Sequence, residues 1–166
     1  MARQSLQPSR DPADYDFVHR LRTRFAETDA MGIIHHAAYL PYLEEARVEY
    51  LRAIGHPYDS VRAGEGDDEG AGGRDFAVLE VSVQYRKPVR FDDEVDVSLV
   101  IGAVTGTTFQ IGYLLAVGGE ARATAVTVHG CVDGRGRPTR LPAWVREAGE
   151  AEVQPFGLPP PGRANP

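Results

Sequence analysis

Residues 24–55, RFAETDAMGIIHHAAYLPYLEEARVEYLRAIG, hold the only long helical pattern of this 166-residue chain, with a glycine-containing turn before it. From residue 39 onward apolar side chains recur at steps of three and four residues, the spacing of one helix face. They are Tyr39, Leu43, Ala46, Tyr50 and Ile54. Gly55 supplies a stop. The sequence therefore predicts an amphipathic helix that ends at about residue 54.

The start of this predicted helix has no ordinary cap. Residues 35–38 read HHAA, without the Ser, Thr, Asp or Asn that usually accepts hydrogen bonds from the first helical amides. Asp29 lies upstream, across a turn at residues 31–32. Amides without an acceptor, at the positive end of a helix dipole, stabilise negative charge that develops on an oxygen. The stretch thus predicts an anion-stabilising helix end beside a carboxylate.

Residues 28–39 (TDAMGIIHHAAY) and 42–47 (YLEEAR) resemble the signature of the hotdog-fold acyl-CoA thioesterases of the 4-hydroxybenzoyl-CoA thioesterase type, especially the Tol-Pal-associated branch. The pattern is an Asp, a Gly three residues on, a His seven residues on and a Glu-x-Ala-Arg segment, and the similarity extends over about residues 17–144. The resemblance implies hydrolysis of a small or medium acyl-CoA to the free acid and CoA. It implies Asp29 and His36 as catalytic residues, with Asp29 as nucleophile or general base, and the backbone amides of His36 and Ala37 as the oxyanion site. It requires no cofactor, since coenzyme A is part of the substrate.

Other residues near this motif are weaker candidates. Some relatives use a helix Glu, so Glu44 and Glu45 are minor catalytic candidates, although Glu44 and Arg47 are also spaced to form a structural ion pair, which for Arg47 we expect at a subunit contact. Glu80 interrupts an apolar strand and either lines the pocket or lies at a subunit contact. His35 stands where relatives often have an aromatic residue, which favours packing.

Two basic runs are candidates for the phosphates of coenzyme A, or are simply solvated. The first comprises Arg86, Lys87 and Arg90, and the second comprises Arg135, Arg137 and Arg140. We predict no metal site, because an adjacent His pair lacks the i, i+4 spacing of helical ligands and no nearby Cys or His completes a set. The single Cys131 lies in a strand pattern and is expected to be packed.

Alternating residues predict a half-buried first strand at residues 17–25. Segments rich in Val, Ile, Thr, Phe or Tyr predict strands at residues 76–86, 94–104, 107–117 and 121–132. Short connections favour an antiparallel meander. The expected architecture is α+β: a hotdog fold with a five-stranded antiparallel sheet wrapped around one long central helix. Residues 58–74 predict a flexible acidic loop, and residues 142–148 a short terminal helix.

Length and composition fit one domain at residues 17–150, between a loosely ordered tail at 1–16 and a Pro-rich tail at 151–166. The net charge of -6 argues against a nucleic-acid partner. No apolar run approaches the ~20 residues of a membrane span, and the start lacks the apolar region of a signal peptide. We therefore expect a cytoplasmic protein.

Two other functions stay open. A hotdog-fold hydratase or dehydratase also pairs a carboxylate with a histidine, though the hydratase motif has its His five residues after its Asp. A non-catalytic acyl-CoA-binding protein would use the same fold. In each case one helix leaves a long sheet edge open, so we expect a homo-oligomer built on a two-fold dimer, either a dimer or a homotetramer.

Overall fold

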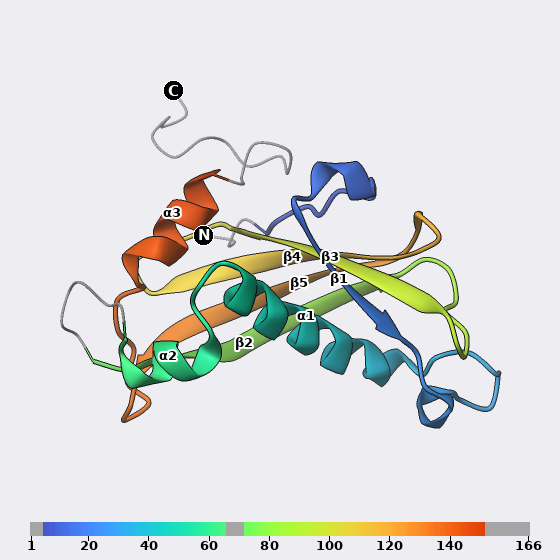
Figure 1. The fold of residues 1–166 in the computed structure, drawn as a ribbon, viewed down its shortest axis with the longest axis horizontal. Coiled ribbons are helices and arrows are strands. Elements are labelled where there is room, and N and C mark those ends of the chain that lie inside the picture. The colour runs from blue at the N-terminus through green and yellow to red at the C-terminus, as the bar shows by residue number, and fades with distance from the viewer. Residues whose placement is uncertain (1–4, 66–71, 152–166) are drawn as a thin grey trace.

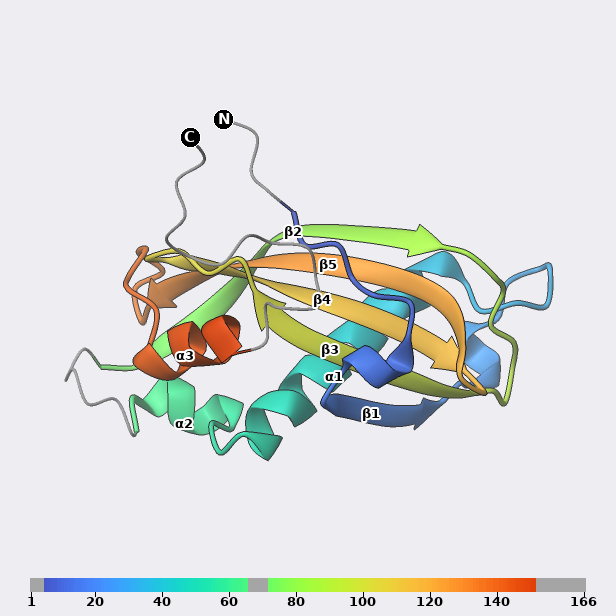
Figure 2. The ribbon, with the colours of Figure 1, turned by 90° about the horizontal axis from the view of Figure 1, so that it is seen from above.

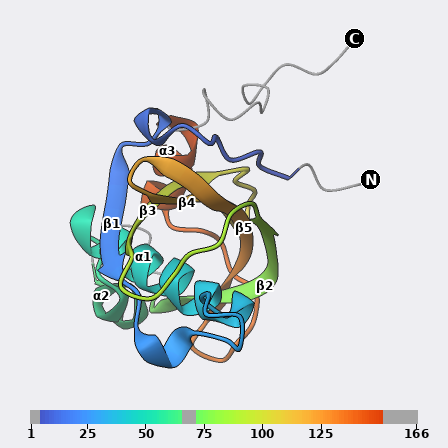
Figure 3. The ribbon, with the colours of Figure 1, turned by 90° about the vertical axis from the view of Figure 1, so that its right-hand side faces the viewer.

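The computed structural model describes residues 5–65 and 72–151, and it confirms the α+β architecture. One antiparallel sheet of five strands curves around the helix α1 (Tyr39–Ala53), as Figure 1 and the end-on view of Figure 3 show. The strands are β1 (Phe17–Arg22), β2 (Arg74–Tyr85), β3 (Glu94–Gly102), β4 (Thr108–Val117) and β5 (Glu120–Asp133). All five predicted strands and the long helix are therefore present.

The strand order is β1-β3-β4-β5-β2, which makes the expected meander only partly right (Figure 2). β3, β4 and β5 follow one another as hairpins, but β2 pairs with β5 and β1 pairs with β3. The chain between β2 and β3 therefore crosses the end of the sheet, from one edge to the strand beside the other edge. Turn residues indicate the length of a connection but not its partners, so the sequence did not reveal this crossing.

The helix α1 buries the apolar face that its spacing predicted. Tyr39, Leu43, Ala46 and Tyr50 are at most 3% exposed and form the core between the helix and the concave face of the sheet. Ile54 follows the last helical residue and is partly exposed, so the predicted face ends one step earlier.

The N-terminal segment packs on the sheet from Leu6 onward. Leu6 is buried against Val100 and Val126 on the convex face of the sheet, and its backbone N–H donates to the side-chain oxygen of Gln110 at 2.9 Å. A 3-10 turn at Pro12–Asp14 follows. Leu6 thus covers part of the face of the sheet that does not contact the helix.

Two short helices flank the sheet. α2 (Tyr58–Ala63) occupies part of the segment expected to be a loop, because Val61 packs into the core and Gly64 ends the helix in a left-handed conformation. α3 (Ala143–Ala151) confirms the predicted terminal helix and packs on β3. The middle of the acidic loop, residues 66–71, and all of the Pro-rich tail except residue 151 lie outside the described residues. Among the described helices, none is both long and apolar enough to cross a membrane.

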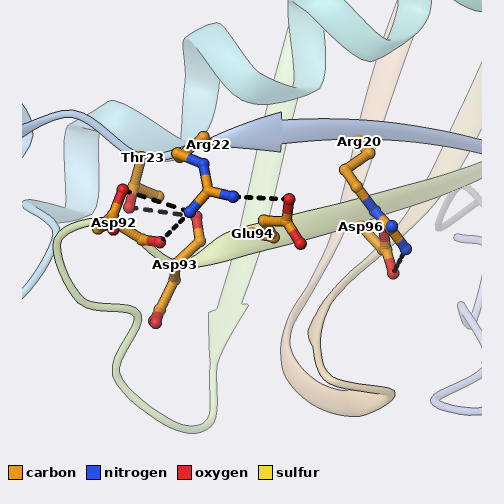
Figure 4. A network of polar contacts seen from close by, with 7 residues as sticks. All are labelled: Arg20, Arg22, Thr23, Asp92, Asp93, Glu94 and Asp96. Atoms are coloured by element: carbon orange, nitrogen blue, oxygen red, sulfur yellow. Dashed lines mark hydrogen bonds and ion pairs between the residues drawn. The ribbon is translucent and has the colours of Figure 1, made fainter.

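A ladder of ion pairs joins β1 to β3 (Figure 4). Arg20 binds Asp96 at 2.7 Å, and Arg22 binds Glu94 at 2.7 Å. Just after β1, the buried hydroxyl of Thr23 donates to the carbonyl oxygen of Arg90 at 2.7 Å. Exposed pairs of this kind contribute about 0–1 kcal/mol each. Their main effect is to fix the register of β1 where the chain enters the turn with Asp29.

Candidate functional site

Asp29 stabilises its own turn and is held by it. Its Oδ1 accepts hydrogen bonds from the backbone N–H of Met31 at 2.8 Å and of Ile33 at 3.4 Å, and its own N–H donates to the Ile33 carbonyl at 2.8 Å. Gly32 makes the turn possible, with φ of 74°. No described residue binds the second carboxylate oxygen of this half-buried side chain. One oxygen is thus anchored, which orients the other.

The helix start differs from the sequence prediction, because it is capped. A 3-10 turn at His36–Ala38 leads into α1, and the Nδ1 of His35 accepts the N–H of Ala37 at 3.1 Å. His35 is exposed and its ring lies 4.1 Å from that of His36, so the expected packing of His35 is wrong. The amide of His36 has no hydrogen-bond partner among the described residues. Of the two amides predicted as an oxyanion site, only that of His36 is left to bind an oxygen.

Glu27 ties the Asp29 turn to the helix. Its carboxylate accepts the hydroxyl of Tyr42 on α1 and the backbone N–H of Arg24 at 2.8 Å, while its carbonyl accepts the N–H of His35 at 2.7 Å. Burial alone would raise the pKa of Glu27, but the hydrogen bonds from Tyr42 and Arg24 together lower it. Sequence reasoning missed this role, although the i, i+3 spacing of Arg24 and Glu27 was a usable signal.

The end of β2 closes the site from the other side. The Tyr85 hydroxyl donates to the carbonyl oxygen of His36 at 2.9 Å, and its ring meets that of Tyr39 edge to face at 5.0 Å. Ile34 donates its N–H to the carbonyl of Val89 at 2.8 Å. The Asp29 turn, the helix start and the connection after β2 therefore form one hydrogen-bonded unit.

None of the minor carboxylate candidates binds the Asp29 turn in the described structure. Glu45 binds His19 of β1 at 2.8 Å, and Glu80 is exposed on β2 rather than buried. Glu44 is exposed, and it forms no ion pair with Arg47 in the described structure. Arg47 is instead buried, with its guanidinium 5.4 Å from the centre of the Tyr58 ring.

The two basic runs lie at opposite ends of β2. Arg86, Lys87 and Arg90 follow the Tyr85 end, where a backbone bridge joins Arg90 to Ile33 of the Asp29 turn. The second run follows Asp133, which pairs with Arg74 at the start of β2. β2 has 12 residues, and a strand of that length spans roughly 40 Å. Within one protomer only the first run is near Asp29.

A cavity of ≈ 210 Å³ lies between α1 and β2. Leu40 and Leu43 of the helix and Val78 and Val81 of β2 give it apolar walls, together with Glu44. Its remaining lining residues are Arg47, Tyr113, Thr127 and His129. Sequence reasoning did not single out Tyr113, Thr127 or His129, because each stands singly between apolar or glycine neighbours in its strand.

Two further findings concern metal binding and the cysteine thiol. In the part of the chain that the structure describes, no three His, Cys, Asp or Glu side chains are grouped so that they could hold a metal ion. Cys131 is buried, as expected, with its thiol directed to the carbonyl of Arg140.

Comparison with known proteins links this arrangement to a family. Residues 23–149 match the family model described as "Thioesterase-like superfamily". A crystal structure of a hypothetical protein from Aquifex aeolicus is similar with a TM-score of 0.69 and 36% identity, covering 80% of this chain and 98% of that one. The acyl-CoA thioesterase YbgC of Haemophilus influenzae is 28% identical over 136 residues, which is 81% of this chain and 95% of the relative. A Thermus thermophilus thioesterase in complex with coenzyme A and Zn has a TM-score of 0.68 and 27% identity, covering 88% of this chain and 98% of that one. The hotdog fold expected from the sequence is confirmed.

Proposed function

The chain belongs to the thioesterase-like superfamily and is a thioester hydrolase, and we propose that its substrate is a small or medium acyl-CoA. The hydrolysis products are the free acid and coenzyme A. The observation that carries the proposal is the Asp29 turn, which holds one carboxylate oxygen on backbone amides beside a helix start with an unpartnered amide. The closer assignment to the Tol-Pal-associated branch, and action in the cytoplasm, are parts of the same proposal.

In the mechanism we propose, the thioester carbonyl lies at the start of the helix. The amide of His36 donates to its oxygen and stabilises the negative charge that develops there, with the helix dipole behind it. Asp29 either attacks the carbonyl carbon directly, forming a mixed anhydride that water hydrolyses after coenzyme A has left, or takes a proton from the water that attacks. The C–S bond then breaks and coenzyme A leaves as the thiolate. Since the amide of Ala37 is occupied by His35, we assign the oxyanion role to His36 alone.

The assembly we propose is a two-fold dimer through β2, either alone or as half of a homotetramer. β2 is one of the two edge strands of the sheet, and it exposes Val78, Leu79, Val81 and Tyr85. Such an edge is normally paired or covered. Strands related by a two-fold axis run antiparallel, so the Arg74 end of one β2 would lie beside the Tyr85 end of the other.

This pairing would join the two basic runs into one coenzyme A site. Arg86, Lys87 and Arg90 of one protomer would meet the second run, with Arg135, Arg137 and Arg140, of the other. The acidic chain would thereby present a local cationic surface to the three phosphates of the substrate.

Release of free thiol from a panel of acyl-CoAs tests the proposed reaction. We expect steady, enzyme-dependent thiol release from at least one member. A hydratase would convert an enoyl-CoA without releasing thiol, and a binding protein would retain acyl-CoA unchanged. Either result, in the absence of thiol release, would refute the proposed function.

A further inference from the structure

The cavity between α1 and β2 continues the helix face on which the proposed oxyanion site lies. His36, Leu40, Leu43 and Arg47 are spaced at steps of three and four residues, so they follow one another along one side of the helix. The last three line the cavity. Leu40 lies one turn beyond His36, and Arg47 lies about 16 Å further along the axis than His36, at a rise of about 1.5 Å per residue. An acyl group held at the His36 amide would therefore extend into this cavity.

The cavity changes character with depth. At its mouth Leu40, Val78 and Val81 are between 39% and 52% exposed, whereas Arg47, Tyr113, Thr127 and His129 at its floor are at most 6% exposed. Cavities of roughly 150 Å³ hold a ligand the size of benzene, so the ≈ 210 Å³ here suit a short chain or a single ring. Apart from the exposed Glu44, an occupant would contact apolar side chains first and polar ones at its far end.

Two polar atoms at the floor are buried without hydrogen-bond partners. They are the Nη1 of Arg47 and the Nδ1 of His129. An unpaired guanidinium nitrogen in a buried position is costly, because no water replaces its lost hydration. No carboxylate forms an ion pair with Arg47 in the described structure. The floor therefore offers a cationic donor that an oxygen atom of a ligand would satisfy.

The neighbours of His129 hold its ring in place. Its Nε2 lies 2.7 Å from the Thr127 hydroxyl, which in turn lies 3.2 Å from the hydroxyl of Tyr113. Its ring stacks on Phe109 at 5.0 Å. Burial, and then the charge of Arg47, lower the pKa of His129 to about 3, so the imidazole is neutral at physiological pH. Because the Thr127 hydroxyl donates to Tyr113, the neutral imidazole donates from Nε2 to Thr127 and keeps Nδ1 as an acceptor for a ligand.

We propose that this cavity binds the acyl group of the substrate, and that Arg47 and His129 bind an oxygen atom carried at the far end of that group. The inference rests on the proposed thioesterase function and names its substrate class: acyl-CoAs whose acyl group ends in a carboxylate or a hydroxyl. Both carry an oxygen that accepts from Arg47, and the hydroxyl also donates to the Nδ1 of His129. Arg47 and His129 are specificity-determining residues here, because they lie remote from the reacting carbonyl.

The test compares three acyl-CoAs with the same six-carbon chain: hexanoyl-CoA, ω-hydroxyhexanoyl-CoA and adipoyl-CoA, which ends in a carboxylate. For the wild-type protein we expect kcat/KM at least about tenfold higher for one of the two oxygen-bearing esters than for hexanoyl-CoA, mainly through a lower KM. The better of the two identifies the group that the floor prefers.

Substitutions then locate the preference. Arg47→Met should bring the ratio of the kcat/KM values close to one, and His129→Phe should reduce it. The matched control is Arg52→Met, which removes an exposed guanidinium from the same helix and should leave the ratio unchanged. Thermal unfolding of each variant shows whether it folds.

The outcomes separate the two proposals. Hydrolysis of hexanoyl-CoA with no preference for either oxygen-bearing ester would overturn this inference and leave the thioesterase function intact, even if Arg47→Met failed to fold. A preference that persists unchanged in folded Arg47→Met and His129→Phe proteins would also overturn it. Absence of thiol release from every acyl-CoA would refute the proposed function and this inference with it.

Discussion

The hydroxyl of Tyr85, at the end of the edge strand β2, donates a hydrogen bond of 2.9 Å to the carbonyl oxygen of His36, at the start of the α1 helix. The sheet edge is thereby fastened to the peptide next to the amide that we propose as the oxyanion donor. Because a peptide group is planar and stiff, holding its neighbours limits how far that amide can turn.

Tyr85→Phe should therefore lower kcat by about fivefold, the equivalent of one hydrogen bond of about 1 kcal/mol, with little change in KM. The measurement is steady-state thiol release. Tyr15→Phe is the control, because it removes a hydroxyl that donates to the carbonyl of Ser9 at 2.8 Å, in the N-terminal segment. Equal losses in both variants would argue against a role for Tyr85 at the site.

Asp29→Asn should lower kcat by about 10²–10⁴-fold, the usual contribution of a general base. The amide oxygen of Asn can still accept from Met31 and Ile33, so the turn and the unfolding transition should be preserved. His36→Ala keeps the backbone amide and should cost less. Near wild-type turnover by the Asn variant would remove Asp29 from the chemistry, and equal losses in both variants would show that the imidazole of His36 is needed.

The stability of the protein should depend on His129 in mild acid. Its folded pKa is lowered from 6.5 to about 3, so between these values the unfolded chain binds a proton that the folded protein does not. Stability contributed by the neutral ring is complete above pH 6.5 and falls as the pH drops toward 3. The slope should be up to about 1.4 kcal/mol per pH unit.

His129→Gln removes this titration. Urea unfolding of both proteins at several pH values should show a shallower loss of stability for the variant below neutral pH. Parallel pH profiles for the two proteins would contradict a neutral buried His129.

A charge at the open sheet edge should disrupt the assembly. Leu79 on β2 is 58% exposed, and Leu79→Lys would place an ammonium where a second β2 would pair. We expect light scattering at micromolar concentration to change from an oligomer to a monomer. Val18 is 56% exposed on the opposite edge strand, and Val18→Lys should leave the oligomer intact. A wild-type monomer with full thioesterase activity would exclude the proposed dimer.

The sequence predicted what depends on neighbours along the chain. The alternation in β1 and the spacing of Tyr39, Leu43 and Ala46 are local patterns, and both elements formed where expected. The helix cap was missed because His35 is not an ordinary capping residue, yet its Nδ1 accepts in the same way. The sequence therefore indicated where the helix begins, but not which atom accepts a hydrogen bond from its first amides.

The floor of the cavity shows a different limit. Thr127 and His129 lie two residues apart on β5, and Tyr113 lies on β4, so only the strand order brings them to Arg47. No spacing in the sequence predicts that these four side chains lie around one cavity. The same holds for β2 and β3, which are consecutive in the chain and separated in the sheet.

The crossing between β2 and β3 has a kinetic consequence. The β3–β4–β5 hairpins close short loops, whereas the outer pairs join distant parts of the chain, Arg22 with Glu94 and Arg74 with Asp133. Closing a longer loop loses more chain entropy before any stabilising contact forms to offset it. Such non-local pairing therefore slows folding. The helix start, the Asp29 turn and β2 all belong to those outer segments. Regain of thioesterase activity on refolding would accordingly report the docking of both sheet edges, later than the central hairpins that give the chain most of its early structure.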